Sequence, residues 1–581
     1  MNLGKLVLSA KSDSFLQEMM VDRPKVVIVA ANQALSNDIQ IRRRMRNEET
    51  WAERQSHRFP DLDLLSIQKG VHQNMLRLVL HLNGYYMDLF DLMNFSQNGH
   101  RLPELTPENV NQYYSLANSV TLNGIYLYQH LLKAGYDPIV IQNYATANLP
   151  DILQEKPLAV CISSNFMFMD DIGEVAAHVK ACAHEIPVIA GGMLVKRLLD
   201  PGESLSPQAL RSFSAFHGKV DAFVVEAQGE QSLVELLQAY RCGNGLEGVP
   251  NLAFYDKRGE MRFTPRQTET LPMDHTAIAW DEIPKDYLRN TLPVSNSRGC
   301  FYRCRFCTYH WLFPKVHYKS LGVLKEELRR IQGLGFVKHV RFTDDNFTAK
   351  KERFKDVLEM MIEEDFDFGW SSYARASALS PELVGLMKAS GCEFVDLGIE
   401  SGSQVILDHM DKRLNREQAL QAIKMLNDHG IYSRGSFIIG YPGETLETFS
   451  DTIEFINESA LPYYSPYLFS YSKRSLVHEE AGRFGLRGIG RAWRHDTMDA
   501  VEASRLMSQM PIRIPKGFAD GLANIEEIYR LLRGKEYAPE TIWEIFRLKR
   551  ELQLSGKKSP LAKPFSLEMI KILQDLKALI N

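Results

Sequence analysis

The sequence has no long hydrophobic run and few cysteines. None of its 581 residues lies in an uninterrupted apolar stretch approaching about eighteen residues, the length that suggests a membrane-spanning helix. The N-terminal segment lacks the apolar core of a secretory signal. Seven cysteines, three of them clustered, do not resemble a disulfide framework. These absences predict a soluble protein with no membrane span, located in the reducing cytoplasm.

The chain also lacks a strong charge of either sign. Lysine and arginine total 68 against 72 aspartate and glutamate residues, which gives a net charge of -4. We therefore expect neither a nucleic acid nor a membrane surface as partner. The length exceeds what one hydrophobic core accommodates, so about three domains are expected.

The most informative segment runs from Arg298 to Cys307 and places Cys300, Cys304 and Cys307 in a CxxxCxxC pattern. A closed structural zinc site needs four ligands, and no paired CxxC or HxxxH lies nearby. A four-iron cluster normally takes four thiolates, so three leave one iron open for a small molecule. The alternatives are a degenerate zinc knuckle or surface thiols. The other cysteines, which are scattered in apolar surroundings, are expected in the core: Cys161, Cys182, Cys242 and Cys392.

This spacing, with the aromatic Phe306 before the last cysteine, resembles the radical S-adenosylmethionine (SAM) superfamily. The resemblance implies a [4Fe-4S] cluster held by the three cysteines, with SAM chelating the open iron. It also implies reductive cleavage of the SAM sulfonium, with the electron coming from an external donor of the flavodoxin or ferredoxin type.

Six strand-and-helix units follow one another between about residues 290 and 475. The strands are expected at 292–296, 337–342, 368–372, 394–399, 435–439 and 465–470, with helices between them. Their spacing predicts a parallel α/β array. The resemblance implies that the array closes into a partial (β/α)6 barrel, similar to a TIM barrel, with the cluster at its top.

Polar and glycine-rich turns follow these strands, and the carboxyl ends of barrel strands are where active sites form. Arg375 is a candidate partner for a carboxylate. By resemblance, the Thr343-Asp-Asp turn holds an ammonium group, the Glu400-Ser turn contacts ribose, and the Gly440-Tyr-Pro turn approaches adenine. The predicted SAM-binding residues are Phe306, Thr343, Asp344, Asp345, Arg375, Glu400, Ser401, Gly440, Tyr441 and Pro442.

Tyrosines gather around the sixth strand. Tyr467 and Tyr471 are candidate catalytic residues that could donate to, or pass a proton from, a substrate radical. Packing in the core or at the surface is the alternative for these side chains.

The N-terminal part predicts a doubly wound, Rossmann-like parallel sheet. Short apolar runs are expected as strands at 25–30, 138–142, 158–163, 187–190 and 221–225, and they alternate with helices. Residues 32–116 interrupt this order as a helical insertion. Open α/β sheets bind ligands at the carboxyl ends of their strands, so the polar turns there form the expected ligand rim.

A sheet of this kind before a radical SAM core resembles the cobalamin-binding domain of the cobalamin-dependent subgroup. No histidine stands in a DxHxxG motif, so the sequence does not identify a cobalt-ligating histidine. The alternatives are a sheet that holds the substrate or one that holds nothing. The predicted cobalamin-binding residues are Thr121, Asn123, Ser163, Ser164, Asn165, Gly191, Gly192, Glu226, Gln228 and Gly229.

The expected division has four parts. They are a cobalamin-binding domain at 1–245, a linker at 246–289, a radical SAM barrel at 290–475 and a helical domain at 476–581. The last part is expected to contain helices at 499–510, 524–533, 539–553 and 565–579.

The resemblance implies a cobalamin-dependent methyltransferase that methylates an unactivated carbon through methylcobalamin and a 5'-deoxyadenosyl radical. The alternatives are rearrangement, cyclisation or 3-amino-3-carboxypropyl transfer on the same scaffold, or an iron-sulfur or cobalamin sensor without enzymatic activity. The substrate, a small molecule or a peptide, is not indicated by the sequence.

Overall fold

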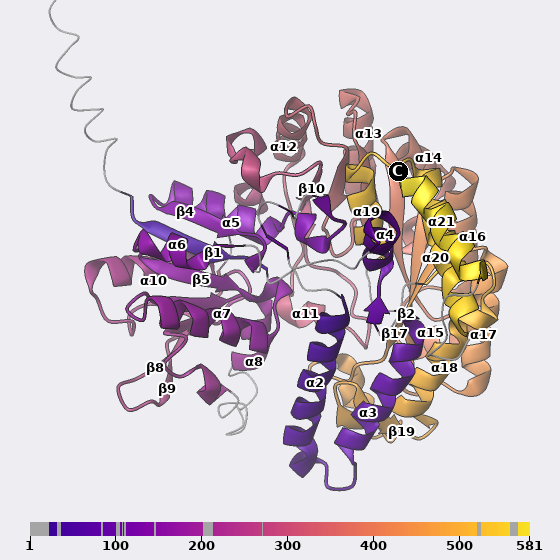
Figure 1. Ribbon diagram of the computed structural model, residues 1–581, viewed down its shortest axis with the longest axis horizontal. Helices are drawn as coiled ribbons and strands as arrows, with labels where there is room; N and C mark the ends of the chain where they lie inside the picture. The colour runs from indigo at the N-terminus through magenta and orange to yellow at the C-terminus, as the bar shows by residue number, and fades with distance from the viewer. Residues whose placement is uncertain are drawn as a thin grey trace, which may run out of the picture. The chain divides into compact units, whose positions relative to one another are not determined.

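The computed structural model describes residues 23–31, 37–82, 85–99, 105–106, 109, 112–144, 147–200, 213–269, 271–519, 525–557 and 567–580. Parts of the predicted 32–116 insertion lie outside these residues. The chain divides into two compact units (Figure 1), one made of 1–32 and 123–270 and the other of 33–122 and 271–581. None of the helices in the described ranges is long and apolar enough to cross a membrane.

The first unit contains a seven-stranded sheet in the order β4-β1-β5-β6-β7-β8-β9. Its strands are β1 (Lys25–Val29), β4 (Asp137–Ile141), β5 (Ala159–Ser163), β6 (Val188–Gly191), β7 (Ala222–Val224), β8 (Leu252–Tyr255) and β9 (Met261–Phe263). The first five are parallel, and their order is the flavodoxin-like 2-1-3-4-5 arrangement. The predicted doubly wound sheet is therefore confirmed.

β8 and β9 form the antiparallel edge of this sheet, β8 pairing with β7 and β9 with β8. They lie within the segment expected as a linker, so part of that segment belongs to the sheet. A hairpin joined to a sheet edge depends on long-range hydrogen bonds, which local composition does not show.

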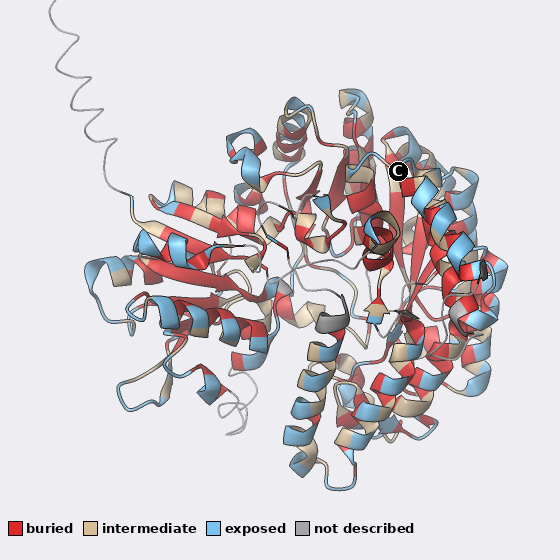
Figure 2. Cartoon of the chain, in the orientation of Figure 1, coloured by how far each residue is buried: buried red, intermediate tan, exposed pale blue. Residues whose placement is uncertain are grey.

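Helices cover the sheet of the first unit on both faces, as its doubly wound order requires. They are α5 (Leu122–Lys133), α6 (Leu149–Gln154), α7 (Met169–Cys182), α8 (Met193–Leu199) and α10 (Glu230–Cys242). Alternating apolar residues of the strands, such as Val27, Val29 and Val160, are fully buried against them, and the buried strands are red in Figure 2. Gly135 follows α5 with φ +88°, the left-handed conformation in which glycine commonly ends a helix.

The second unit contains six parallel strands in the order β10-β13-β14-β15-β16-β17. They are β10 (Thr291–Val294), β13 (His339–Phe342), β14 (Gly369–Ala374), β15 (Cys392–Glu400), β16 (Tyr432–Ile439) and β17 (Tyr463–Leu468). The helices between them are α12 (Leu321–Gly333), α13 (Lys351–Glu364), α14 (Pro381–Ala389), α15 (Gln404–His409), α16 (Arg416–Asp428) and α17 (Leu446–Ser459). The predicted six-stranded partial barrel is therefore confirmed.

The insertion packs in the second unit, against the helices that follow the barrel. It contains α2 (Asn37–Gln55), α3 (Leu64–Met75), β2 (Leu80–Leu82), β3 (Tyr85–Met87) and α4 (Leu89–Asn98). Asn74 on α3 donates to the carbonyl of Val501 at 3.0 Å, and Leu89 and Phe90 share a core with Leu576 near the C-terminus. The sequence placed this segment with the N-terminal sheet because the chain leaves that sheet to form it, but its contacts are with distant residues.

The C-terminal region is helical, as expected, with α18 (Ala500–Arg513), α19 (Ile525–Gly534), α20 (Pro539–Lys557) and α21 (Leu567–Ile580). A small antiparallel sheet that was not predicted precedes α18, with β18 (Arg487–Ile489), β19 (Ala492–His495) and β20 (Met498–Asp499).

α19 fills the barrel from the amino-terminal ends of its strands. The Tyr529 ring on α19 lies near the rings of His339, Phe394 and Tyr432, which lie at or near the start of β13, β15 and β16. Glu526, one turn earlier, accepts a hydrogen bond from Ser371 Oγ at 2.9 Å. α19 therefore covers the amino-terminal end of the barrel.

Candidate functional site

The three clustered cysteines lie on the loop that follows β10. A short antiparallel pair, β11 (Ser297–Arg298) with β12 (His317–Tyr318), closes the base of this loop. Gly299 at its start has φ +98°, and a Cβ there would lie 2.3 Å from the carbonyl oxygen of Lys315, so only glycine fits. α11 (Tyr309–Leu312) follows the last cysteine. The loop is thus held in shape by backbone pairing rather than by the cysteines themselves.

The cysteine side chains are shielded from water. Cys304 is buried, while Cys300 and Cys307 are half-buried. Burial raises the pKa of the Cys300 thiol and raises the pKa of Cys307 to about 11. Among the described residues, no group of three or more His, Cys, Asp or Glu side chains is arranged to hold a single metal ion. Three thiols on one loop suit a larger polynuclear centre instead.

Two carboxylates after β13 support this loop. Asp344 is fully buried and accepts hydrogen bonds from the Asn296 amide at 3.0 Å and from Ser297 Oγ at 2.5 Å. Asp345 accepts from the Gly299 amide at 3.0 Å. Burial raises the pKa of Asp344 to about 6, partly offset by these donors. Both carboxylate oxygens of Asp344 accept hydrogen bonds within the protein, so this residue holds the start of the cysteine loop. The preceding residue, Thr343, is half-buried.

Arg375 lies directly against the cysteine loop. Its guanidinium stacks 3.6 Å from the centre of the Tyr302 ring, and its Nη1 lies 3.6 Å from Cys304 Sγ. Its Nη2 donates to the carbonyl of Lys412. Its buried Nε has no hydrogen-bond partner among the described residues. Arg375 thus lies beside the predicted cluster ligands, and its Nε donor remains for a bound anionic group.

Glu400 ends β15 in a strained backbone conformation, with φ +76°. The register between β15 and β16 shifts at this point, so Glu400 is displaced from regular strand geometry. Its buried carboxylate pairs with Lys412 Nζ at 3.0 Å, and the same ammonium lies 5.6 Å from the centre of the Phe306 ring. Lys412 therefore joins the cysteine loop to the end of β15, a role that the sequence did not indicate.

The turns after β15 and β16 pack tightly on neighbouring elements. The amide of Gly402, beside Ser401, donates to Thr452 Oγ1 at 3.0 Å. Gly440 has φ +83°, and a Cβ there would lie 2.4 Å from the Trp493 ring. Tyr441 and Pro442, which follow it, are buried. Both turns are therefore buried against neighbouring elements, and their contact with SAM stays a prediction.

Behind Gly440 lies a buried acid. Glu444 is completely buried, and its Oε2 accepts the Gly440 amide at 2.5 Å. Burial, opposed only by this hydrogen bond, raises the pKa of Glu444 to about 8. The carboxyl group is therefore mostly neutral at pH 7, and it fixes the conformation of the turn.

The two candidate catalytic tyrosines have different surroundings. Tyr467 on β17 is 48% exposed, although the rest of its strand is buried. Tyr471 is buried, and its hydroxyl lies 2.5 Å from His478 Nδ1. Tyr467 is the one available to a molecule in solution.

The concave face of the barrel carries a layer of charged side chains that the sequence analysis did not single out. Asp396 on β15 is paired with Arg434 on β16 at 2.7 Å and with Arg341 on β13 at 3.3 Å. Arg341 also pairs with Glu526 of α19 at 3.2 Å. Because β14 lies between β13 and β15, these contacts must cross the concave face. This layer could have been predicted from the sequence, because its charged residues stand at alternate positions of otherwise apolar strands.

Exposure increases above this layer. The inward-facing residues nearer the carboxyl ends are half-buried or exposed, among them Thr343, Gly398, Ser436, Ile438 and Tyr467. The barrel interior therefore has a charged floor and opens toward the strand ends that carry the cysteine loop.

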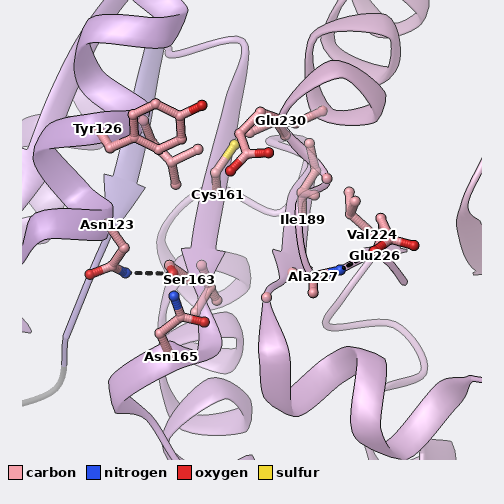
Figure 3. A pocket seen from close by; sticks show the side chains of 16 residues that line it. Asn123, Tyr126, Cys161, Ser163, Asn165, Ile189, Val224, Glu226, Ala227 and Glu230 are labelled. Carbon is pink, nitrogen blue, oxygen red and sulfur yellow. Dashed lines mark hydrogen bonds between the residues drawn. The ribbon is translucent and has the colours of Figure 1, made fainter. Parts of the chain in front are cut away.

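The first unit has a cavity, partly open to solvent, at the carboxyl ends of β5, β6 and β7. Figure 3 shows Asn123 of α5 directed toward Ser163, to which its amide donates at 2.6 Å. Cys161 and Tyr126 lie farther inside the cavity. Burial raises the pKa of Cys161 to about 12, so its thiol stays protonated at neutral pH.

Most of the predicted rim residues line this cavity. They are Asn123, Ser163, Asn165, Gly191, Gly192, Glu226 and Gly229. Thr121, Ser164 and Gln228 do not line it. Ser164 Oγ instead accepts the Val195 amide in the first turns of α8, at 3.4 Å. The Glu226 carboxylate is held by Lys196 at 2.7 Å.

Comparisons with known proteins agree with this architecture. Residues 294–456 match the Radical SAM superfamily. The chain is 33% identical over 250 residues to an uncharacterized methyltransferase of Pyrococcus horikoshii, covering 42% of this chain and 54% of that protein. It is 23% identical to the anaerobic magnesium-protoporphyrin IX monomethyl ester cyclase of Rubrivivax gelatinosus over 59% of this chain and 64% of that one. The chain thus spans about half to two-thirds of these relatives.

Two solved structures share the fold. One is the cobalamin-dependent SAM radical enzyme OxsB with aqua-cobalamin and SAM bound, with a TM-score of 0.54 and 15% identity, covering 96% of this chain and 84% of that one. The other is the radical SAM methyltransferase TsrM of Kitasatospora setae, with a TM-score of 0.51 and 17% identity, covering 67% and 80%. Residues 294–456 are therefore similar to the Radical SAM superfamily, and the chain shares its fold with these two cobalamin-dependent and radical SAM enzymes.

Proposed function

We propose that this protein is a cobalamin-dependent radical SAM methyltransferase that acts on an unactivated carbon. The observation that carries the proposal is the pairing of two sites in one chain. A three-cysteine loop lies at the carboxyl ends of the barrel strands, and a polar cavity lies at the carboxyl ends of a flavodoxin-like sheet. The methyltransferase names of a relative and of a structural neighbour support the same reaction.

The donor set of the barrel fits an iron-sulfur cluster with bound SAM. Cys300, Cys304 and Cys307 would hold three irons and leave the fourth for SAM. Arg375 places a positive charge 3.6 Å from Cys304 Sγ, which stabilises a thiolate, and its free Nε is available to a carboxylate. We propose that the turn after β16, which contains Gly440, contacts the adenine through residues beside the glycine.

The residues that line the cavity of the first unit are also suited to hold part of a cobalamin molecule. Gly192 has φ +103°, and a Cβ there would lie 2.8 Å from Asn165 Oδ1, so glycine keeps this strand end open. Asn123, Ser163 and Asn165 provide hydrogen-bonding groups on an otherwise largely apolar cavity wall. We propose that these residues would hold cobalamin; no histidine is among the residues that line the cavity.

When bound, the cluster and SAM supply a 5'-deoxyadenosyl radical, and cobalamin supplies the methyl group. The protein contributes position and exclusion of water. The charged floor formed by Arg341, Asp396 and Arg434 closes the lower barrel, so a substrate is confined to the space above it. Tyr467, which is exposed there, is placed to contact the substrate and to give or accept a proton. An external one-electron donor of the flavodoxin or ferredoxin type completes the system.

The first test is anaerobic purification from cells supplied with cobalamin, followed by a visible spectrum and quantitation of iron, sulfide and cobalt. We expect about four irons per chain, consistent with three cysteine ligands and one open iron, and one cobalt. Iron without cobalt would contradict the role of the first unit. Neither metal, after reconstitution as well, would contradict the whole proposal.

Two matched pairs of variants assign the metals to their sites. Cys304→Ala should abolish the cluster absorbance and SAM cleavage, whereas Cys242→Ala, at an exposed cysteine, should retain both. Ala227→Trp fills the cavity of the first unit and should lower the cobalt content while leaving the iron content unchanged. Ala181→Trp, on an exposed position of α7, is its control. Loss of cobalt in both tryptophan variants would contradict the assigned site.

The reaction itself is tested by product mass. With SAM labelled in its methyl group, a methyltransferase yields a product that carries the label. Because one relative is named a cyclase, the diagnostic alternative is a product that has lost hydrogen and carries no label. Such a product would replace methyl transfer by ring formation.

A further inference from the structure

A basic surface surrounds the outer side of the cysteine loop. It is formed by three segments that are distant in sequence: the loop and α11 at 301–313, the end of α15 and its turn at 409–413, and the segment at 473–484. We call it the loop-side surface. Its cations are Arg303, Arg305, Arg413, Lys473, Arg474 and Arg483, apart from the buried Lys412, and its carboxylates are Asp411, Glu479 and Glu480.

Backbone contacts show that these segments form one surface. The Arg305 amide donates to the carbonyl of Met410 at 2.9 Å, and the Val477 amide donates to the carbonyl of Arg305 at 2.8 Å. The cysteine loop is therefore hydrogen-bonded on both sides to the two other segments.

Side-chain contacts also join the three segments of the loop-side surface. Arg305 forms an ion pair with Glu480, which also pairs with Arg483 at 3.5 Å. The Arg474 guanidinium stacks 3.9 Å from the centre of the Trp311 ring. The positions of these cations relative to the cysteines are thus set by packing.

The charge of this surface contrasts with that of the chain. Six cations face three carboxylates here, whereas the whole chain has a net charge of -4. Arg413 and Arg483 are 66% and 59% exposed, and each pairs with a carboxylate of the same surface, Arg413 with Asp411 at 3.4 Å and Arg483 with Glu480 at 3.5 Å. Local surplus charge of this kind speeds the encounter with a partner of opposite sign.

An aromatic side chain stands next to the cluster ligands on the same loop. Phe301, between Cys300 and Tyr302, is 58% exposed. An exposed apolar group within a charged rim is the usual composition of a small, transient protein interface. Its position adjacent to Cys300 brings any partner that covers it close to the cluster.

From these observations we infer that the loop-side surface is the docking site of an acidic one-electron carrier protein. The inference rests on the proposed function, because it takes the three cysteines as cluster ligands. In the transfer, the carrier is oxidised by one electron and the cluster is reduced from the 2+ to the 1+ state. No bond forms between the proteins. The occupant is identified by its negative charge and its one-electron chemistry.

The test compares two reductants on the reconstituted full-length protein. The triple variant Arg303→Glu/Arg413→Glu/Arg483→Glu reverses three exposed charges of the surface. The matched control Lys69→Glu/Lys351→Glu/Lys424→Glu reverses three exposed charges elsewhere in the same unit. The readout is the rate at which the visible absorbance of the cluster is bleached, first by a reduced acidic flavodoxin and then by dithionite, a small reductant that needs no docking.

With flavodoxin at low salt, the surface variant should be reduced at least about 10-fold more slowly than the wild type, the lower end of electrostatic rate enhancement. The control should stay within about 2-fold. Raising the salt should slow the wild type toward the variant, because surface charges are screened. With dithionite, all three proteins should bleach at similar rates.

Two results would overturn the inference: a surface variant as fast as the wild type with flavodoxin, or an equal loss with dithionite. The second result would show that the substitutions damage the cluster itself. Since cluster bleaching requires neither cobalamin nor substrate, the result does not depend on methyl transfer. Absence of any cluster would instead contradict the proposed function, and with it this docking site.

Discussion

Substitution of Glu444 tests how the turn after β16, which contains Gly440, is held in its conformation. The substitution is Glu444→Gln, which keeps the shape and removes the acid. In the folded protein burial raises the pKa of this carboxyl from 4.5 to about 8, whereas in the unfolded chain it is solvated. The folded state therefore binds the proton more tightly. The resulting stabilisation is fully present below pH 4.5 and is lost as the pH rises through 8.

The magnitude follows from the size of the shift. A difference of about 3.5 pH units corresponds to about 5 kcal/mol, at 1.36 kcal/mol per unit. Most of it appears between pH 5 and pH 8. Over that interval we expect the free energy of unfolding of the wild type to fall by about 3–4 kcal/mol relative to Glu444→Gln, whose side chain cannot ionise.

The assay is urea unfolding followed by tryptophan fluorescence at pH 5, 6, 7 and 8. All six tryptophans lie in the unit that contains Glu444, so the signal reports that unit alone. Glu447→Gln, an exposed position of α17, is the control for loss of a charge. A wild-type-minus-variant difference that stays constant over the four pH values would refute the assignment of a buried neutral acid.

Further substitutions probe the turn, the barrel floor and the lysine bridge. Gly440→Ala adds a Cβ 2.4 Å from the Trp493 ring at a residue with positive φ. We expect the free energy of unfolding in the same urea assay to fall by about 2–5 kcal/mol, and a fall of less than about 1 kcal/mol would contradict this packing. Arg434→Met removes one partner of a buried carboxylate and should cost about 3–5 kcal/mol, whereas unchanged stability would show that the carboxyl is already neutral. Lys412→Met leaves the buried Glu400 unpaired, and we expect a lower iron content after purification; full occupancy would argue against its bridging role.

The local features of this protein were determined by its sequence. Three cysteines within eight residues lie on one loop in any fold, because the chain between them is too short to separate them. The buried strands were recognisable as short apolar runs. α14 begins at a local signal, the N-cap Ser380, whose hydroxyl accepts the Leu383 amide at 3.3 Å. The order of strands and turns also predicted seven of the sixteen residues that line the cavity of the first unit.

Other features depended on contacts between distant segments. α19 reaches the barrel floor only in the folded chain, and its Glu526 pairs with Arg341, which precedes it by 185 residues. The insertion packs beside the C-terminal helices, and β8 extends the first sheet. Asp344 was expected to hold a ligand, yet its oxygens hold the cysteine loop. Such outcomes are set by which surfaces bury one another, because tertiary packing, rather than local propensity, selects among partners far apart in sequence.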